Sequence, residues 1–371
     1  METPSWLSSV PHNFGHSAAG TLKADEWRTM ATVYLPVALV SLWGEGTKHP
    51  SPQIASSARQ ILDHTMALVS AISLACMRTM TESRMNAYRK YILSWKADLT
   101  DIHSKAKHTV NSHMAIHIYD FLHSFGPVHS WWCFPFERVN GQLQRFPSNH
   151  KFGMFLFKQY CSIYLFCIIS GELESTMLSS FSRAARLKHW LSRPDQPPVL
   201  KECKNVFDKA FGVLNNPALD EDTTPSAFGP VPDVLRSIVT DRKIALRAYH
   251  HFDNVTFARC STHVGNSLIL FYPGGSRTAS PVPGTIEYII VRQDSSVRYA
   301  IRQQLPAPTG TIDPFLLYHH FRATIYSTSL SSSLELIPPD WVMSHFARWN
   351  MDANRAVVLT LSRVSLCCKH L

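Results

Sequence analysis

The sequence predicts an α+β protein, in which an N-terminal all-helical domain is followed by a smaller β-rich, barrel-like domain. Three observations lead to this prediction. Apolar residues recur at three- and four-residue spacing in the first half, short β-type runs broken by Gly, Pro and Ser fill the second half, and a Pro-rich stretch separates the two. A chain of 371 residues is long enough for two domains with proper cores.

The helical part is predicted from stripes of apolar residues and from capping residues. The run Val33–Trp43 is apolar but contains Pro36 and is too short to span a membrane, so we expect a buried, kinked helix there. A loose tail over 1–23 is expected before this helix, which has Asp25 as its cap, and a turn is expected at 44–52 after it. A long helix that ends near Met80 and a helix capped by Thr81 follow. The last helix before residue 127 ends at Gly126 and carries Val110, Met114, Ile118, Phe121 and Phe125.

The β-rich part is predicted from six runs of β-type residues at 267–272, 285–292, 297–303, 324–327, 334–337 and 356–362. Their spacing indicates a small barrel or a curled sheet. The segment Trp341–Trp349 reads instead as a short helix or turn. His263, Gly265 and Asn266 form a polar group that we interpret as turn chemistry, since no nucleophile–base pair or Gly-rich phosphate loop is recognisable in this half.

The domain boundaries follow from these patterns. We expect a tail over 1–23, a helical domain over 24–214, a Pro-rich linker over 215–233, a β-rich domain over 234–363 and a tail over 364–371. Residues 154–170 form an apolar run with one Lys and no acidic residue. Removing this run together with one Gly joins NHKFG to ELESTM without interruption, which suggests that the run is the translation of an unspliced intron. The alternative is a hydrophobic insertion.

The stretch 126–153 is the most distinctive part of the chain. Trp131, Trp132, Phe134 and Phe136 are expected to be mostly buried, and Pro135 can occupy the first position of a helix. Glu137 would then lie in the first helical turn, where the helix dipole favours a negative charge. Gly141, one turn later, would leave room for a ligand beside Glu137. The plain alternative is a core helix with a solvated basic face.

A family resemblance is carried by a set of residues in this stretch and by the later motif GELESTM. The residues are Gly126, Pro127, Trp131, Trp132, Pro135, Phe136, Glu137, Arg138, Gly141, Arg145 and Lys151. This pattern resembles the helical domain of unknown function that follows the transposase domain in En/Spm (CACTA-type) transposon proteins, in its basidiomycete fungal form. The resemblance extends more loosely from Trp27 to Arg363 and includes the C-terminal β-rich region of those proteins. It implies a transposon-derived chain with an intracellular, nuclear location.

Two classes of function follow. In the first, the chain is a C-terminal fragment or relic of a transposase and contacts DNA, a transposase catalytic domain or another copy of itself. Glu137 is the candidate for a third catalytic carboxylate, with Mg or Mn needed only if the chain completes a transposase active site. The other two carboxylates are not identifiable, so we expect no catalysis and no cofactor for this chain alone. The residues expected to contact nucleic acid are Arg138, Arg145, Lys151, Arg183 and Arg186.

The second class is a non-enzymatic protein-interaction or structural module without a DNA role. The net charge of +9 is modest and suits either class. Eight Cys without a C-x-x-C pair argue against a zinc module and a disulfide framework. His113 and His117, one helical turn apart, are weak candidates for metal ligands, and packing against neighbouring aromatic residues is the alternative. No membrane partner is expected.

Overall fold

The computed structural model describes residues 1–7, 9–11, 13–16, 20–133, 136–137, 182–183, 186, 189–190, 199 and 228–361. It confirms the α+β class, with helices in residues 24–125 followed by a β-rich region in residues 229–360. Both belong to one compact unit, while Trp131–Pro217 forms a second unit. The helices of the first unit are α1 (Ala24–Thr29), the π-helix η2 (Met30–Tyr34), α2 (Leu35–Trp43), α3 (Pro52–Ala75), α4 (Glu82–Ile102) and α5 (Val110–Phe125).

The first helix is irregular where the sequence places Pro36. In a regular α-helix the amide of residue 36 would donate to the carbonyl of residue 32, and proline has no amide hydrogen. The chain therefore passes through the wider turn η2, in which the Leu35 amide donates to the Met30 carbonyl, before α2 begins. The irregularity predicted at Pro36 takes the form of a π-turn, which is a common way for a helix to absorb a local mismatch.

Hydroxyl side chains set the start of the three longer helices. Ser51 Oγ accepts from the Ile54 amide, Thr81 Oγ1 from the Arg84 amide and Thr109 Oγ1 from the Ser112 amide. Each bond satisfies one of the amides that a helix N-terminus leaves without an intrahelical partner. The cap predicted at Thr81 is confirmed, and α5 ends at Gly126, whose φ of 73° favours glycine.

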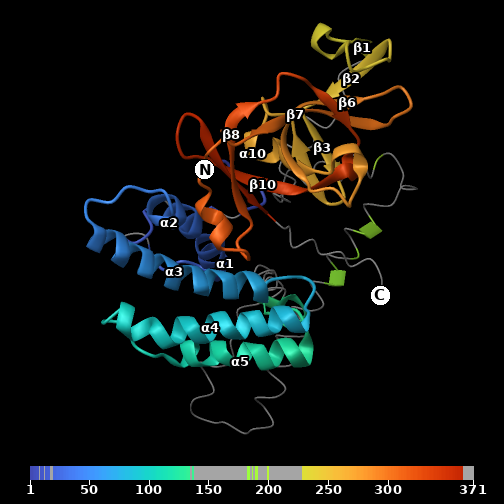
Figure 1. Cartoon of the computed structure of the whole chain (residues 1–371). Coiled ribbons are helices and arrows are strands. Elements are labelled where there is room, and N and C mark those ends of the chain that lie inside the picture. Colours follow the sequence, from blue (N-terminus) through green and yellow to red (C-terminus); the bar gives the residue numbers. More distant parts are fainter. Residues whose placement is uncertain are drawn as a thin grey trace. The chain divides into compact units, whose positions relative to one another are not determined.

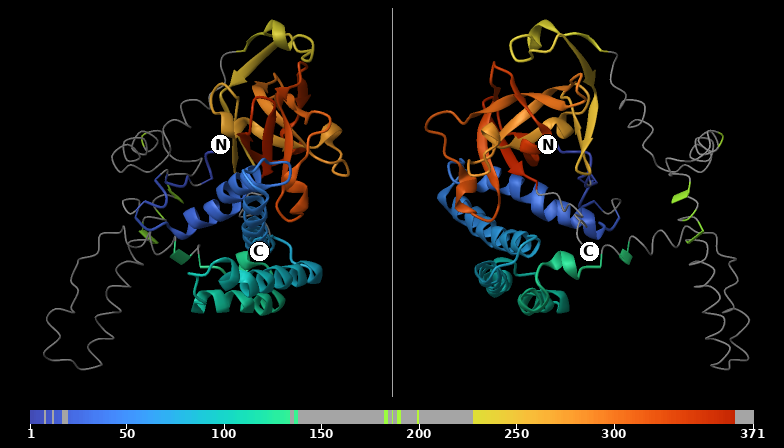
Figure 2. Two further views of the ribbon diagram at one scale, coloured as in Figure 1. Left: turned by 60° about the vertical axis from the view of Figure 1, so that its left-hand side comes forward. Right: turned by 90° about the vertical axis from the view of Figure 1, so that its right-hand side faces the viewer.

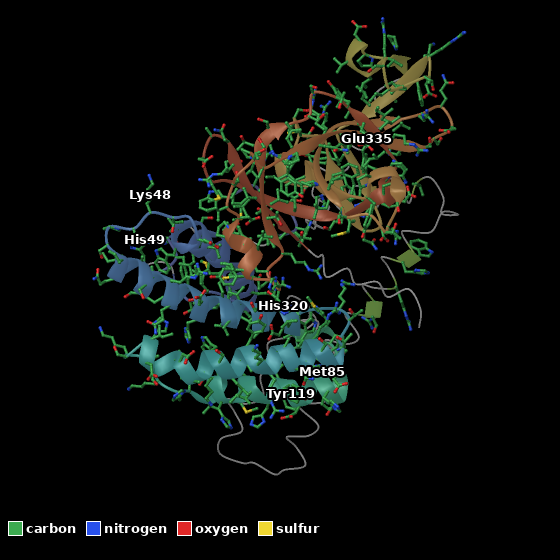
Figure 3. All side chains as sticks on the ribbon, in the orientation of Figure 1. Lys48, His49, Met85, Tyr119, His320 and Glu335 are labelled. Carbon is green, nitrogen blue, oxygen red and sulfur yellow. The ribbon has the colours of Figure 1, made fainter. Side chains whose placement is uncertain are left out.

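Helices α3, α4 and α5 lie side by side (Figure 1). Tyr88 of α4 donates to the Ala115 carbonyl of α5 over 2.6 Å. Tyr119 of α5 faces α4, where the Arg89 guanidinium carbon lies 4.9 Å from the centre of its ring (Figure 3). The apolar residues that defined α5 in the sequence are largely exposed, including Val110, Met114, Phe121 and Phe125. The spacing located this helix correctly but did not identify its buried face.

Eleven strands are present in the described residues: β1 (Gly229–Pro230), β2 (Lys243–Arg247), β3 (Tyr249–Phe252), β4 (Val255–Ala258), β5 (Leu268–Phe271), β6 (Val282–Val291), β7 (Val297–Pro306), β8 (Ala323–Leu330), β9 (Glu335–Ile337), β10 (Val342–Asn350) and β11 (Arg355–Thr360). All six predicted runs correspond to strands. The interpretation of Trp341–Trp349 as a helix or turn was wrong beyond its first residue, because this segment forms β10.

The strands form a barrel-like sheet (Figure 2). The nine-stranded sheet has the order β1-β2-β6-β5-β10-β11-β8-β7-β9, and an additional pairing of β6 with β7 closes β6-β5-β10-β11-β8-β7 into a ring. All of these pairings are antiparallel. Closure pairs the edges that an open sheet would leave exposed. Strands β3 and β4 form a separate hairpin.

Among the clusters of buried residues in the described part of this unit, three show how its elements pack together. One is built on the barrel strands and contains Ile269, Phe271, Ile286 and Tyr299. A second packs the segment around Leu235 against Ile290 and Ala300. The third combines Val37, Leu62 and Met66 of the helices with Phe315, Val357 and Leu359 of the β-rich region, so helices and barrel share part of their core.

The first seven residues are ordered against the barrel, and the expectation of a loose tail over 1–23 was wrong for them. The backbone of Glu2 makes two hydrogen bonds with that of Arg348, and Glu2 Oε2 lies 2.6 Å from Arg348 Nε. Pro4 is buried, and Trp6 packs against the shared cluster of helices and barrel. Composition indicated a polar tail, but backbone pairing with a strand depends little on side-chain type.

Residues 154–170 and most of the Pro-rich linker over 215–233 lie outside the described residues. So does the stretch 362–371.

Candidate ligand-binding site

The residues singled out in the stretch 126–153 are only partly described. Glu137 is exposed, and its amide donates to the Cys133 carbonyl over 2.9 Å, as in a helical turn. Arg183 and Arg186 are exposed. Phe134, Pro135, Arg138, Gly141, Arg145 and Lys151 lie outside the described residues. Among the residues that are described, no group of three or more His, Cys, Asp or Glu could hold a metal ion.

The aromatic residues of the same stretch differ in burial. Trp131 and Trp132 are half-buried, whereas Phe136 is 71% exposed. The prediction that Phe136 is buried was therefore wrong. A three- or four-residue spacing shows which residues share a helix face, but it does not show whether that face is covered.

A cavity of about 260 Å³ lies on the β-rich region, between the β3–β4 hairpin and strand β10. Its walls are largely apolar. The lining residues are Phe252, Asp253, Val255, Phe257, Arg322, Pro339, Val342, Met343, Ser344, His345 and Thr360. The two charged ones, Asp253 and Arg322, are both exposed, so opposite charges lie at the opening of the cavity.

A β-bulge shapes the β10 wall of this cavity. Val342 pairs with Phe271 and Ser344 pairs with Leu270, so Met343 is an extra residue in β10 opposite β5. A bulge interrupts the regular alternation of side chains between the two faces of a strand. Four consecutive residues, 342–345, can therefore line one cavity, which a regular strand would not allow.

His345 forms the inner end of this wall, and both of its ring nitrogens are occupied. The residue is 2% exposed. Trp6 Nε1 lies 3.3 Å from Nδ1, and the Asn266 carbonyl oxygen lies 3.2 Å from Nε2. An indole can only donate and a carbonyl can only accept, so the imidazole is neutral with its hydrogen on Nε2. Phe257 stacks on the ring with 4.8 Å between centroids.

The N-terminal segment supports this arrangement through Asn266, which belongs to the short helix α10 (Val264–Ser267). The Ser5 amide donates to Asn266 Oδ1 over 2.8 Å, and Asn266 Nδ2 donates to Ser5 Oγ over 3.0 Å. The Asn266 amide also donates to His263 Nδ1. The turn chemistry predicted for His263, Gly265 and Asn266 is present, and its role is to seat the N-terminal segment beside His345.

Ser344, one of the residues that line the cavity, has a side-chain oxygen with unused hydrogen-bonding capacity. Its Oγ is buried and has no hydrogen-bond partner within the described part of the chain. Leaving a buried hydroxyl unsatisfied costs about 1–3 kcal/mol. A bound group that hydrogen-bonds to this hydroxyl would recover that energy.

The β3–β4 hairpin supplies the opposite wall and is anchored by His250. The Tyr299 hydroxyl and His250 Nδ1 lie 2.7 Å apart. Burial, followed by the positive charges of Arg247 and His251, lowers the pKa of His250 to about 4. His250 is therefore neutral at pH 7, and Nδ1 can accept the hydrogen bond from Tyr299, whose own pKa burial raises.

The sequence contained signals for this site that our interpretation missed. Asp253 and Asn254 both have positive φ, at 48° and 58°, and join the runs YHHF and VTFA. An Asp-Asn pair between two β-type runs is typical of a tight hairpin turn. The bulge at Met343 and the approach of Trp6 to His345 had no recognisable signal.

Comparisons of the chain with protein-family models, with curated proteins and with solved structures found no match. The resemblance to En/Spm transposon proteins therefore stays a prediction. In the described residues, no helix is long and apolar enough to cross a membrane. The fold and the site define the class as an α+β protein with a barrel-like antiparallel sheet and an aromatic-lined cavity.

Proposed function

We propose that this chain is a non-enzymatic interaction module, and that the cavity between the β3–β4 hairpin and β10 receives one side chain of a partner protein. A largely apolar cavity, one of whose lining residues is Ser344 with a buried hydroxyl that has no hydrogen-bond partner among the described residues, carries this proposal. A volume of about 260 Å³ is below the range of about 300–1,000 Å³ that is typical of small-molecule sites, and it suits a single side chain.

The arrangement of Ser344 and His345 argues against acyl-transfer chemistry at this cavity. A serine nucleophile needs a base within hydrogen-bonding reach of its hydroxyl. Both nitrogens of His345 are engaged by Trp6 and Asn266, and Ser344 Oγ has no partner among the described residues. The pair therefore provides shape and a polar contact rather than an activated nucleophile.

The chemistry of the walls defines the side chain that fits best. Phe252, Val255 and Phe257 provide apolar contact, and the Ser344 hydroxyl can provide one hydrogen bond. We infer a partner side chain with an apolar body and one terminal hydrogen-bonding group, as in tyrosine or lysine. The exposed carboxylate of Asp253 and guanidinium of Arg322 are placed to contact the backbone of the partner.

The proposal is tested by NMR titration of the full chain with N-acetyl-tyrosinamide and N-acetyl-lysinamide, with N-acetyl-alaninamide as a control compound. We expect shifts of the amides of Ser344 and His345 with one of the first two compounds. V255F should abolish these shifts, because Val255 lines the cavity. The matched control is T256F, because neighbouring strand residues point to opposite faces. Unmoved amides, or equal binding by V255F, would contradict the proposal.

Contact with DNA is the second candidate function, and exposed arginines favour it. Arg183 and Arg186 are three residues apart in helical residues, a spacing that puts side chains on one face of a helix. Such a pair can contact two phosphates, and the net charge of +9 favours approach to a polyanion.

This second candidate predicts a specific change in salt dependence. Replacing both arginines, R183Q with R186Q, should lower the affinity for a 30-base-pair duplex and reduce the slope of log affinity against log salt by about 2. The control is R242Q with R277Q, two exposed arginines of the β-rich region. Equal slopes for the two double variants would remove the reason for assigning DNA contact to Arg183 and Arg186.

A further inference from the structure

The exposed face of α5 carries two histidines that point toward each other. His113 Nε2 and His117 Nε2 are 3.3 Å apart, and the two rings meet edge to face with 5.0 Å between centroids. The expectation that both rings pack against neighbouring aromatic residues does not describe this geometry, since His113 is exposed and the side chain of His117 is 44% exposed. Both imidazole side chains are therefore accessible to solvent.

The separation of the two nitrogens matches that of two ligands on one tetrahedral ion. Zinc binds imidazole nitrogen at about 2.0–2.1 Å, which places two tetrahedral ligands ~3.3–3.4 Å apart. Square-planar or octahedral neighbours at the same bond length would be closer, at about 2.8–3.0 Å. A separation of 3.3 Å thus favours tetrahedral coordination without movement of the helix.

A third side chain holds His117 in the form that a metal requires. Asp120 Oδ2 lies 3.3 Å from His117 Nδ1. A carboxylate there keeps the imidazole hydrogen on Nδ1 and leaves the lone pair of Nε2 directed toward His113. Metal-binding histidines commonly have such a carboxylate on the nitrogen that does not bind the metal, and removing it typically weakens binding by about 10–100-fold.

We propose that His113 and His117 form a zinc site on α5, with Asp120 as a positioning residue. The two imidazole nitrogens bind Zn²⁺ directly, and water fills the remaining positions. Among the described residues no third His, Cys, Asp or Glu is within reach. The ion therefore keeps open positions where a donor from another molecule can replace water.

The test is isothermal titration calorimetry of the full chain with Zn²⁺. Variants are compared with one another, so that zinc binding by other histidines contributes equally to each and cancels. H113A and H117A should each weaken the tightest binding at least tenfold. The matched control H123A, which changes an exposed histidine of the same helix, should leave it unchanged. Circular dichroism should show the same helix content in all variants, because these side chains are exposed. A zinc isotherm of H113A or H117A equal to that of the wild type would overturn the proposal.

The role of Asp120 has its own readout. D120N should weaken zinc binding about tenfold and should reduce the fraction of His117 with its hydrogen on Nδ1, which ring ¹⁵N chemical shifts measure directly. D98N, at an exposed aspartate on α4, is the control and should change neither quantity. If D120N weakens zinc binding while the His117 ring shifts stay constant, Asp120 acts by charge alone and the positioning role is wrong.

Discussion

Single residues of the β-rich region combine stability with the shape of the cavity. His345 is held between Trp6 and Asn266, and Phe257 stacks on its ring. The ring centroid of Phe257 in turn lies 5.6 Å from that of Tyr299, whose hydroxyl hydrogen-bonds to His250. This chain of contacts runs from the N-terminal segment through the cavity wall to the β3–β4 hairpin, so a change at one residue is expected to alter the cavity.

The pKa of His250 predicts a dependence of stability on pH. Burial lowers the pKa in the folded protein to about 4, whereas an unfolded chain has a His pKa of about 6.5. Between these values the unfolded state binds more protons, so the stabilising contribution of neutral His250 is full above pH 6.5 and declines as the pH falls toward 4.

We therefore expect the urea midpoint of the wild type to fall more between pH 7 and pH 5 than that of H250Q, which cannot be protonated. H251Q is a useful control because His251 is the exposed neighbour in the same strand. A parallel decline of the wild type and H250Q would show that His250 is not the titrating group.

At the scale of elements, β10 and α5 show how a pattern can be ambiguous. β10 contains all but the first residue of the segment Trp341–Trp349, and the bulge at Met343 breaks the two-residue alternation that identifies a strand. α5 has a regular apolar stripe, yet Val110 is 77% exposed and Phe125 is 62% exposed. For β10, the bulge kept the sequence pattern from indicating a strand. For α5, the pattern indicated the helix but did not indicate which of its faces is buried.

The ring of strands explains why the bulge and the cavity occur together. In a closed sheet each strand must curve, and bulges let it bend sharply. A second irregularity lies in β6, between Ile286 and Tyr288, where β6 pairs with β7. The bulge in β10 places residues 342–345 along one wall of the cavity, and one of them, Ser344, has a buried hydroxyl without a hydrogen-bond partner among the described residues.

At the scale of the whole first unit, the core shared by helices and barrel predicts coupled stability. Leu62 of α3 is fully buried in the same cluster as Phe315 and Val357, and Leu122 of α5 is equally buried but is not part of that cluster. L62A should lower the free energy of unfolding by about 2–5 kcal/mol. It should also speed hydrogen exchange at the amides of Val357 and Leu359 in β11.

L122A is a matched control, since it removes the same atoms from another buried helical position. L122A should destabilise the helices without selectively speeding hydrogen exchange at the β11 amides, as long as these amides exchange by local opening of the structure around them. If both variants speed exchange at β11 equally, the shared cluster does not link helices and barrel energetically.

The sequence alone determined which segments become helices and most of the strands. The cap at Thr81, the break at Pro36 and the end of α5 at Gly126 are local features, since each depends on hydrogen bonds or dihedral angles within a few residues. The α+β class followed from the same local patterns, and so did the pairing of two histidines one turn apart on α5.

Only the tertiary structure decided which faces are buried and which distant residues meet. The ordered N-terminal segment, the shared core and the cavity all depend on contacts between residues that are far apart in the sequence, and Trp6 and His345 are the most distant example among the cavity's supporting contacts. Burial of a face depends on what another element places against it, and a periodic pattern carries no information about that partner. Local patterns can therefore specify the elements, while the site appears only when the ring of strands closes.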